Sequence, residues 1–186
     1  RLGLNIEPDT LASIRENAKL IKTVSPERTV EELNKIFLSD KPSIGIDIML
    51  GTGLLELVLP EVAALAGIRQ DKQPGDDVYR HTMRALDAAA SDELIENKKD
   101  KNLMWAALYH DTGKSRTSQE DPKTKRIVFF GHQIVSKRMA KKRLTALKAQ
   151  TAGIDIKAVE KLIDNHMFET KAYFSDKAIR RFIRKI

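Results

Sequence analysis

The chain has 186 residues, no cysteine and a formal net charge of +7. That length allows one sizeable core or two smaller ones, and the lack of thiols excludes disulfides and cysteine-ligated metal centres. No apolar run is long enough to span a membrane and no signal peptide opens the chain, so we expect a cytoplasmic protein with no membrane partner. The first residue is not methionine, which favours a fragment or a processed form.

Charge is distributed unevenly along the chain. Residues 1–93 hold 11 Lys and Arg against 16 Asp and Glu, a balance of −5, whereas residues 94–186 hold 22 against 10, a balance of +12. A polyanionic partner such as a nucleic acid should therefore meet the second half. A basic surface that is simply solvated is the alternative.

Apolar residues recur three and four positions apart in most of the chain, which predicts an all-α fold. In the first third, helices are expected from Pro8, from Pro26 after an N-cap at Ser25, and from Pro42, followed by short helical turns to residue 66. The polar composition of residues 67–77 indicates a linker, and we place a domain boundary there.

Four helices are expected after the linker, near residues 77–90, 102–111, 131–148 and 155–167, with a basic helix from about residue 175. Only residues 127–130 look like a short extended run. We find no internal repeat.

The four histidines all fall on apolar sides of expected helices, where an imidazole needs a polar partner. They are His81, His110, His132 and His166. His81 is expected to share its face with Val78, Ala85 and Ala88. At each single position, a hydrogen-bonded core histidine is the alternative to a metal ligand.

Asp111 strengthens the case for a metal, because it follows a run at 103–109 that is apolar on every side. An ionised carboxylate in such surroundings is costly unless it is paired or binds metal. Imidazole and carboxylate ligands without sulfur suit Mn, Fe, Co, Ni or Zn, and also Mg where fewer histidines bind. Gly113 is expected to end the helix.

Two cations follow this His-Asp doublet. Lys114 and Arg116 are expected within reach of a metal at Asp111, where they would bind phosphate oxygens and neutralise developing charge. A solvent loop that happens to be basic is the alternative.

Taken in order, four segments resemble the HD superfamily of metal-dependent phosphohydrolases. The resemblance implies that His81, His110 and Asp111 hold a principal divalent ion and that His132 and His166 complete a second position or orient phosphate. It implies an enzyme that hydrolyses phosphomonoesters or 2′,3′-cyclic phosphates, with Asp111 and Lys114 as catalytic residues. The segments are Asp77–Thr82 (DVYRHT), Tyr109–Lys114 (YHDTGK), Phe129–His132 (FFGH) and Asp164–Met167 (DNHM).

A second resemblance covers nearly the whole chain. Arg1–Glu7, Val24–Arg28 (VSPER) and Gly53–Glu61 look like the helical region after the catalytic head of bacterial CCA-adding tRNA nucleotidyltransferases and poly(A) polymerases. Ser175–Phe182 is similar to a segment of the HD domain that follows in one branch of that family. The resemblance implies a neck-like bundle over 1–66 and an HD domain over 67–186.

The departures from this family also carry expectations. The nucleotidyltransferase head is not in the chain, so no nucleotidyltransferase active site is expected here, whether the parent activity is CCA or poly(A) addition. The usual final Asp ligand would fall beyond Ile186, so the HD domain is expected to be truncated at its C-terminal end.

The family resemblance makes RNA, in particular tRNA, the expected partner. If His132, Val135 and Met139 face inward, basic residues of the same helix share its outer face. Two rival interpretations are a metal-poor HD scaffold that only binds tRNA and an independent HD nucleotide phosphohydrolase. The candidate RNA-binding residues are Lys137, Arg138, Lys141, Lys142, Arg181 and Arg184.

Overall fold

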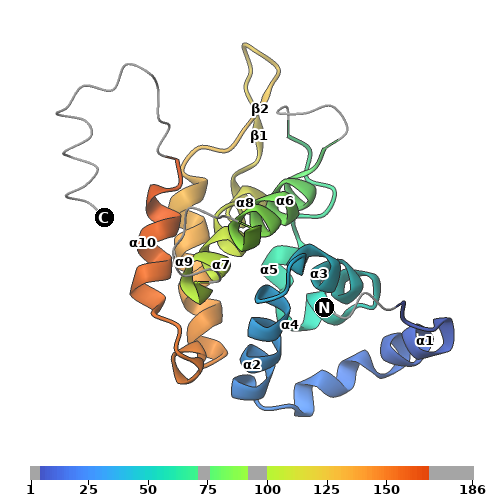
Figure 1. Ribbon diagram of the computed structural model, residues 1–186. Helices are drawn as coiled ribbons and strands as arrows, with labels where there is room; N and C mark the ends of the chain where they lie inside the picture. The colour runs from blue at the N-terminus through green and yellow to red at the C-terminus, as the bar shows by residue number, and fades with distance from the viewer. Residues whose placement is uncertain (1–4, 71–75, 92–99, 168–186) are drawn as a thin grey trace.

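The computed structural model describes residues 5–70, 76–91 and 100–167, and these are mainly helical (Figure 1). The all-α prediction is confirmed. A two-stranded antiparallel hairpin of β1 (Gln119–Glu120) and β2 (Ile127–Val128) projects from the helices, with Gln119 paired to Val128. The extended run expected at 127–130 thus supplies one short strand. The expected basic helix from residue 175, with Arg181 and Arg184, lies outside the described residues.

The first third of the chain forms short helices, most of which open on a proline as expected. The Ser25 hydroxyl accepts a hydrogen bond from the Arg28 amide and caps α2. The first helix has no buried residue, so it contributes none to the core. These elements are α1 (Pro8–Asn17), the 3₁₀ helix η1 (Ala18–Thr23), α2 (Pro26–Phe37), α3 (Pro42–Gly51), α4 (Leu54–Val58) and α5 (Pro60–Ala63).

The remaining helices lie close to the expected ranges, with two short additions, the single turn α8 and the 3₁₀ helix η2. Figure 1 shows α9 and α10 side by side, with α7 and α6 following across the molecule. The elements are α6 (Val78–Ser91), α7 (Lys101–Tyr109), α8 (Lys114–Thr117), α9 (His132–Ala146), the 3₁₀ helix η2 (Ala149–Ala152) and α10 (Ile156–Asn165).

The buried face of α6 differs from the expected one. Its centre is the series Val78, Thr82 and Leu86, all with no exposed surface, whereas Ala88 is exposed and Ala85 only partly covered. His81 therefore lies at the edge of the buried face. The expectation failed because the stripe with Ala85 and Ala88 and the stripe with Thr82 and Leu86 both have the period of a helix. Only packing against α7 determines which of the two is buried.

The described ends of the expected linker are paired with each other. The Val78 amide donates to the Ile68 carbonyl (2.9 Å), and the Gly67 amide donates to Asp77 Oδ2 (2.7 Å). The second oxygen of Asp77 accepts from the Arg80 amide and so caps α6. Hydrogen bonds between residues 67–68 and residues 77–78 thus fix the start of α6.

One hydrophobic core runs through both halves of the described chain. The Phe37 and Trp105 rings meet edge to face with centroids 4.9 Å apart, and the Trp105 indole donates to Asn34 Oδ1 (3.0 Å). Arg143 of α9 donates hydrogen bonds from Nε and Nη2 to the carboxylate oxygens of Glu61 in α5, at 2.9 to 3.2 Å. Helices α2 and α5 therefore support the helices that carry the histidines.

Within the described residues, no helix has both the length and the apolar character that a membrane span requires.

Replacing Asn34 by alanine tests this shared core. The change leaves the buried indole N–H of Trp105 without its acceptor, so we expect the free energy of unfolding to fall by about 1–3 kcal/mol. Urea denaturation, followed by helical circular dichroism and Trp105 fluorescence, measures it. The exposed Asn17→Ala is the control, with an expected change within about 0.5 kcal/mol. Two separate transitions in the wild type would contradict a single core.

Candidate metal centre

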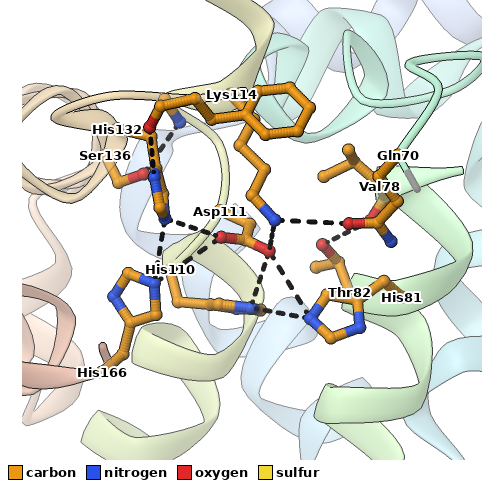
Figure 2. Close-up of polar contacts among 12 residues, drawn as sticks. Gln70, Val78, His81, Thr82, His110, Asp111, Lys114, His132, Ser136 and His166 are labelled. Carbon is orange, nitrogen blue, oxygen red and sulfur yellow. Dashed lines mark hydrogen bonds and ion pairs between the residues drawn. The ribbon is translucent and has the colours of Figure 1, made fainter. Parts of the chain in front are cut away.

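All four histidines meet around the carboxylate of Asp111, although they come from four different places in the chain (Figure 2). His81 lies in the first turn of α6, His110 directly follows α7, His132 opens α9, and His166 directly follows α10. The five site residues predicted as metal ligands are therefore brought together.

The two oxygens of Asp111 face different histidines. Oδ2 lies 3.1 Å from His110 Nε2 and 3.5 Å from His81 Nε2. On the other side, Oδ1 lies 3.2 Å from His132 Nε2 and 3.6 Å from His166 Nε2. The carboxylate is 2% exposed, so it joins two candidate metal triads in a dry environment.

The tautomers of three rings follow from their backbone contacts. His110, His132 and His166 each place Nδ1 at 2.7 to 2.8 Å from the carbonyl oxygen three residues earlier. A carbonyl oxygen only accepts hydrogen bonds, so each Nδ1 carries the proton. In the neutral ring, Nε2 then has a lone pair directed at the Asp111 side, as a metal ligand requires.

This arrangement fits a divalent cation. Nε2 of His110 lies 3.4 Å from Nε2 of His81, and Nε2 of His132 lies 3.2 Å from Nε2 of His166. Lone pairs that face each other and a carboxylate repel unless a proton or a metal ion lies among them. Ligand atoms about 2.1 Å from one ion are about 3.0–3.4 Å apart, close to the 3.1–3.5 Å separations in the first triad and the 3.2–3.6 Å separations in the second.

Asp111 is held in its ionised form. Burial raises its pKa, but hydrogen bonds from the surrounding histidines, when these are protonated, outweigh burial and hold the pKa well below the usual aspartate range. The ammonium group of Lys114, 2.7 Å from Oδ2, favours the charged carboxylate independently of the histidines, so the carboxylate can offer its negative charge to a metal ion.

Lys114 also reaches this carboxylate. Its Nζ donates to Asp111 Oδ2 at 2.7 Å and to Gln70 Oε1 at 3.3 Å, and it lies 5.1 Å from the centre of the Phe129 ring. The residue is 3% exposed. The lysine predicted to bind phosphate is thus a buried partner of the predicted metal ligand, whereas Arg116, two residues later, is exposed.

Close packing between the α7–α8 turn and α9 positions His132. The Gly113 amide donates to Ser136 Oγ (2.8 Å), and a Cβ atom at Gly113 would lie 2.2 Å from the His132 carbonyl oxygen. Gly113 has φ −63°, so it does not end a helix in the left-handed conformation as expected. Helix α7 ends at Tyr109, and glycine is needed at 113 because the backbones approach so closely.

The basic face of α9 is partly neutralised by α10. Lys137 pairs with Asp164 at 3.1 Å, and Lys141 pairs with Glu160 at 3.4 Å. Lys137 is half-buried, because it faces α10 rather than the outer side. Arg138 and Lys142 are exposed and form no ion pair among the described residues.

Sequence reasoning missed Gln70 and Ser136. Gln70 lies within the expected linker, yet it is 4% exposed and its Nε2 donates to the Asp77 carbonyl at 3.3 Å. No local pattern distinguishes it from a solvated linker residue. Ser136 had one available signal, since it lies one helical turn after His132 and so shares its face.

Two family models match the chain. One, described as the probable RNA and SrmB-binding site of polymerase A, matches residues 3–65, and the HD domain matches residues 78–182.

Curated relatives named as tRNA nucleotidyltransferases or CCA proteins align with the chain. It is 33% identical to an A-adding tRNA nucleotidyltransferase of Deinococcus radiodurans over 99% of its own length and 42% of that protein. A CC-adding tRNA nucleotidyltransferase of Thermus thermophilus is 27% identical over 97% of the chain and 41% of that protein. A multifunctional CCA protein of Pseudomonas fluorescens is 30% identical over 64% of the chain and 29% of that protein. The chain thus spans less than half the length of these relatives.

The close approach at Gly113 predicts a sensitive position. Gly113→Ala should push the start of α9 and His132 away from Asp111, lowering the free energy of unfolding by about 1–3 kcal/mol and weakening metal binding. Thermal denaturation and calorimetric metal titration measure the two effects. Gly51→Ala is the matched control, since a Cβ atom added there would meet nothing within 4 Å outside its own helix backbone and little change is expected. Equal behaviour of the two variants would contradict the packing argument.

Proposed function

The chain belongs to the tRNA nucleotidyltransferase and poly(A) polymerase family, to its RNA-binding region and HD domain, and on that premise we propose a metal-dependent phosphohydrolase that binds tRNA. The observation that carries the hydrolase proposal is the convergence of four imidazoles on one buried carboxylate. The proposed substrates are phosphomonoesters or 2′,3′-cyclic phosphates, and the expected location is the cytoplasm.

In this proposal, His81, His110 and Asp111 hold one divalent ion, and Asp111, His132 and His166 hold a second or orient phosphate. When bound, the ion would polarise a phosphoryl oxygen and lower the pKa of a water molecule. The ion is one of Mg, Mn, Ni, Co, Fe or Zn, with nitrogen ligands favouring the transition metals.

The other residues act on charge and position. Lys114 neutralises Asp111 and offers its remaining donor capacity to a phosphate oxygen. Arg116 is exposed, so it can contact a phosphate group further from the carboxylate. Carbonyl oxygens of Ala107, Phe129 and Ile163 keep three imidazoles in the tautomer that can bind metal.

One observation favours the rival scaffold interpretation. The ammonium group of Lys114 already balances the charge of Asp111, so the fold tolerates this buried carboxylate without a metal ion. In that case the HD domain would contribute only to RNA binding. Activity in the presence of metal distinguishes the two functions.

The first test is hydrolysis. We expect 2′,3′-cyclic AMP or a simple phosphomonoester to be cleaved when Mn²⁺, Ni²⁺, Co²⁺ or Mg²⁺ is added, and Asp111→Asn to lower the rate by at least about tenfold. Chromatographic product analysis measures it. Asp9→Asn, an exposed carboxylate in α1, should behave as the wild type. If the wild type turns over substrate no faster than Asp111→Asn with any of these metals, the hydrolase proposal is wrong and the scaffold function remains.

The second test concerns tRNA. We propose that the exposed Arg138 and Lys142 contact phosphates, with Lys137 and Lys141 joining when their pairs with α10 open. Arg138→Glu with Lys142→Glu should weaken tRNA binding and reduce the log–log salt slope by about one unit per lost contact. Binding is measured by fluorescence anisotropy across a salt series.

A charge-matched control separates local contacts from net charge. Lys157→Glu with Lys161→Glu makes the same change in charge at exposed positions with the same spacing on α10. We expect the α9 variant to lose more affinity than this control. An equal loss in both would reject α9 as the tRNA-binding face.

A further inference from the structure

We propose that the two triads sharing Asp111 bind divalent ions with unequal affinity, and that Lys114 makes the Asp111–His132–His166 triad the tighter one. The inference rests on the metal dependence proposed above. It reverses the order implied by the HD resemblance, in which His81 and His110 hold the principal ion.

The triads use different oxygens of the shared carboxylate. His81 and His110 lie beside Oδ2, and His132 and His166 lie beside Oδ1 (Figure 2). Each triad has two imidazoles and one carboxylate oxygen, with ligand atoms within 4.8 Å of one another. Among the described residues, ligand number and type are therefore equal in the two triads, and the difference between them lies in their surroundings.

The surroundings differ in the position of one charge. Lys114 Nζ donates its hydrogen bond to Oδ2, 2.7 Å away, on the His81–His110 side. Oδ1 is turned toward His132 and His166 instead (Figure 2). An ammonium group at a ligand oxygen repels a dication bound to that oxygen, and the repulsion decreases with distance toward the far side of the carboxylate.

The position of this ammonium group is fixed. Gln70 accepts from Nζ at 3.3 Å while its own amide nitrogen donates to the Asp77 carbonyl, and the Phe129 ring covers the group. Because Lys114 is 3% exposed, water screens its charge little. A divalent ion in the His81–His110 triad is thus repelled by a nearby positive charge, and an anionic phosphate group would offset this repulsion.

Cobalt(II) titration of the full chain tests the order, with calorimetry and visible absorption as readouts. We expect two binding events whose dissociation constants differ by at least roughly tenfold. His166→Ala should remove the tight event, and His81→Ala should remove the weak event and keep the tight one. Loss of the tight event in His81→Ala, with its retention in His166→Ala, would overturn the proposal.

The role of Lys114 has its own test. Lys114→Met keeps the straight side chain and removes the charge, so it should tighten the weak event until the two constants differ by less than about threefold. Lys157→Met, an exposed lysine of α10, is the matched control and should leave both constants unchanged. Thermal denaturation verifies folding. If Lys114→Met does not fold, Gln70→Glu should draw the ammonium group from Oδ2 and tighten the weak event too.

The outcomes separate this inference from the proposed function. Unchanged constants in a folded Lys114 or Gln70 variant overturn the role of Lys114 and leave the metal-dependent hydrolase intact. If the wild type binds two ions with equal dissociation constants, or binds one ion only, the inference of unequal affinities is wrong and the proposed function stands. No binding of cobalt(II), manganese(II) or nickel(II) by the wild type removes the metal premise of both.

Discussion

Burying the Asp111 carboxylate among helices demands partners for both of its oxygens, and four separate segments of the chain supply them. The α7–α8 turn holds the carboxylate, and its neighbours are placed by the way α6, α9 and α10 pack around that turn. Gly113 allows α9 to come close enough, and the Glu61–Arg143 ion pair ties α9 to the first third of the chain. The first third of the chain is thus part of the mechanical support of the candidate metal centre.

Helix ends are what make this centre possible. The last carbonyls of a helix lack intrahelical partners, and the imidazoles of His110 and His166 use such carbonyls in α7 and α10. Each contact gives a carbonyl of the last turn a side-chain donor, in α10 beside the His166 amide that the Ile163 carbonyl also accepts, and directs Nε2 toward Asp111. The same contact therefore lies at the end of the helix and orients the ligand. This agrees with the position of both histidines directly after the last helical residue.

Sequence periodicity predicted most helices to within two or three residues, and the inward placement of four histidines predicted the cluster. It failed where long-range packing decides. Ala85 and Ala88 made a stripe of helical period that packing leaves largely uncovered, Gly113 serves a close backbone approach rather than a helix stop, and Gln70 is buried within an apparently polar linker. None of these outcomes has a local signal, because each depends on a segment that is distant along the chain. The spacing of the histidines in the sequence also cannot predict which of the two triads would bind metal more tightly.

Charge balance connects the centre to the ligands proposed for it. Asp111 and Lys114 form an ion pair whose charges cancel, so the fold can bury the carboxylate without a metal ion. Each divalent ion bound as proposed would add two positive charges to a site whose central carboxylate is already paired. Such a centre would be cationic and would favour a ligand that brings negative charge with it. Phosphate esters meet that requirement, and an RNA partner held by the basic second half would present them at high local concentration.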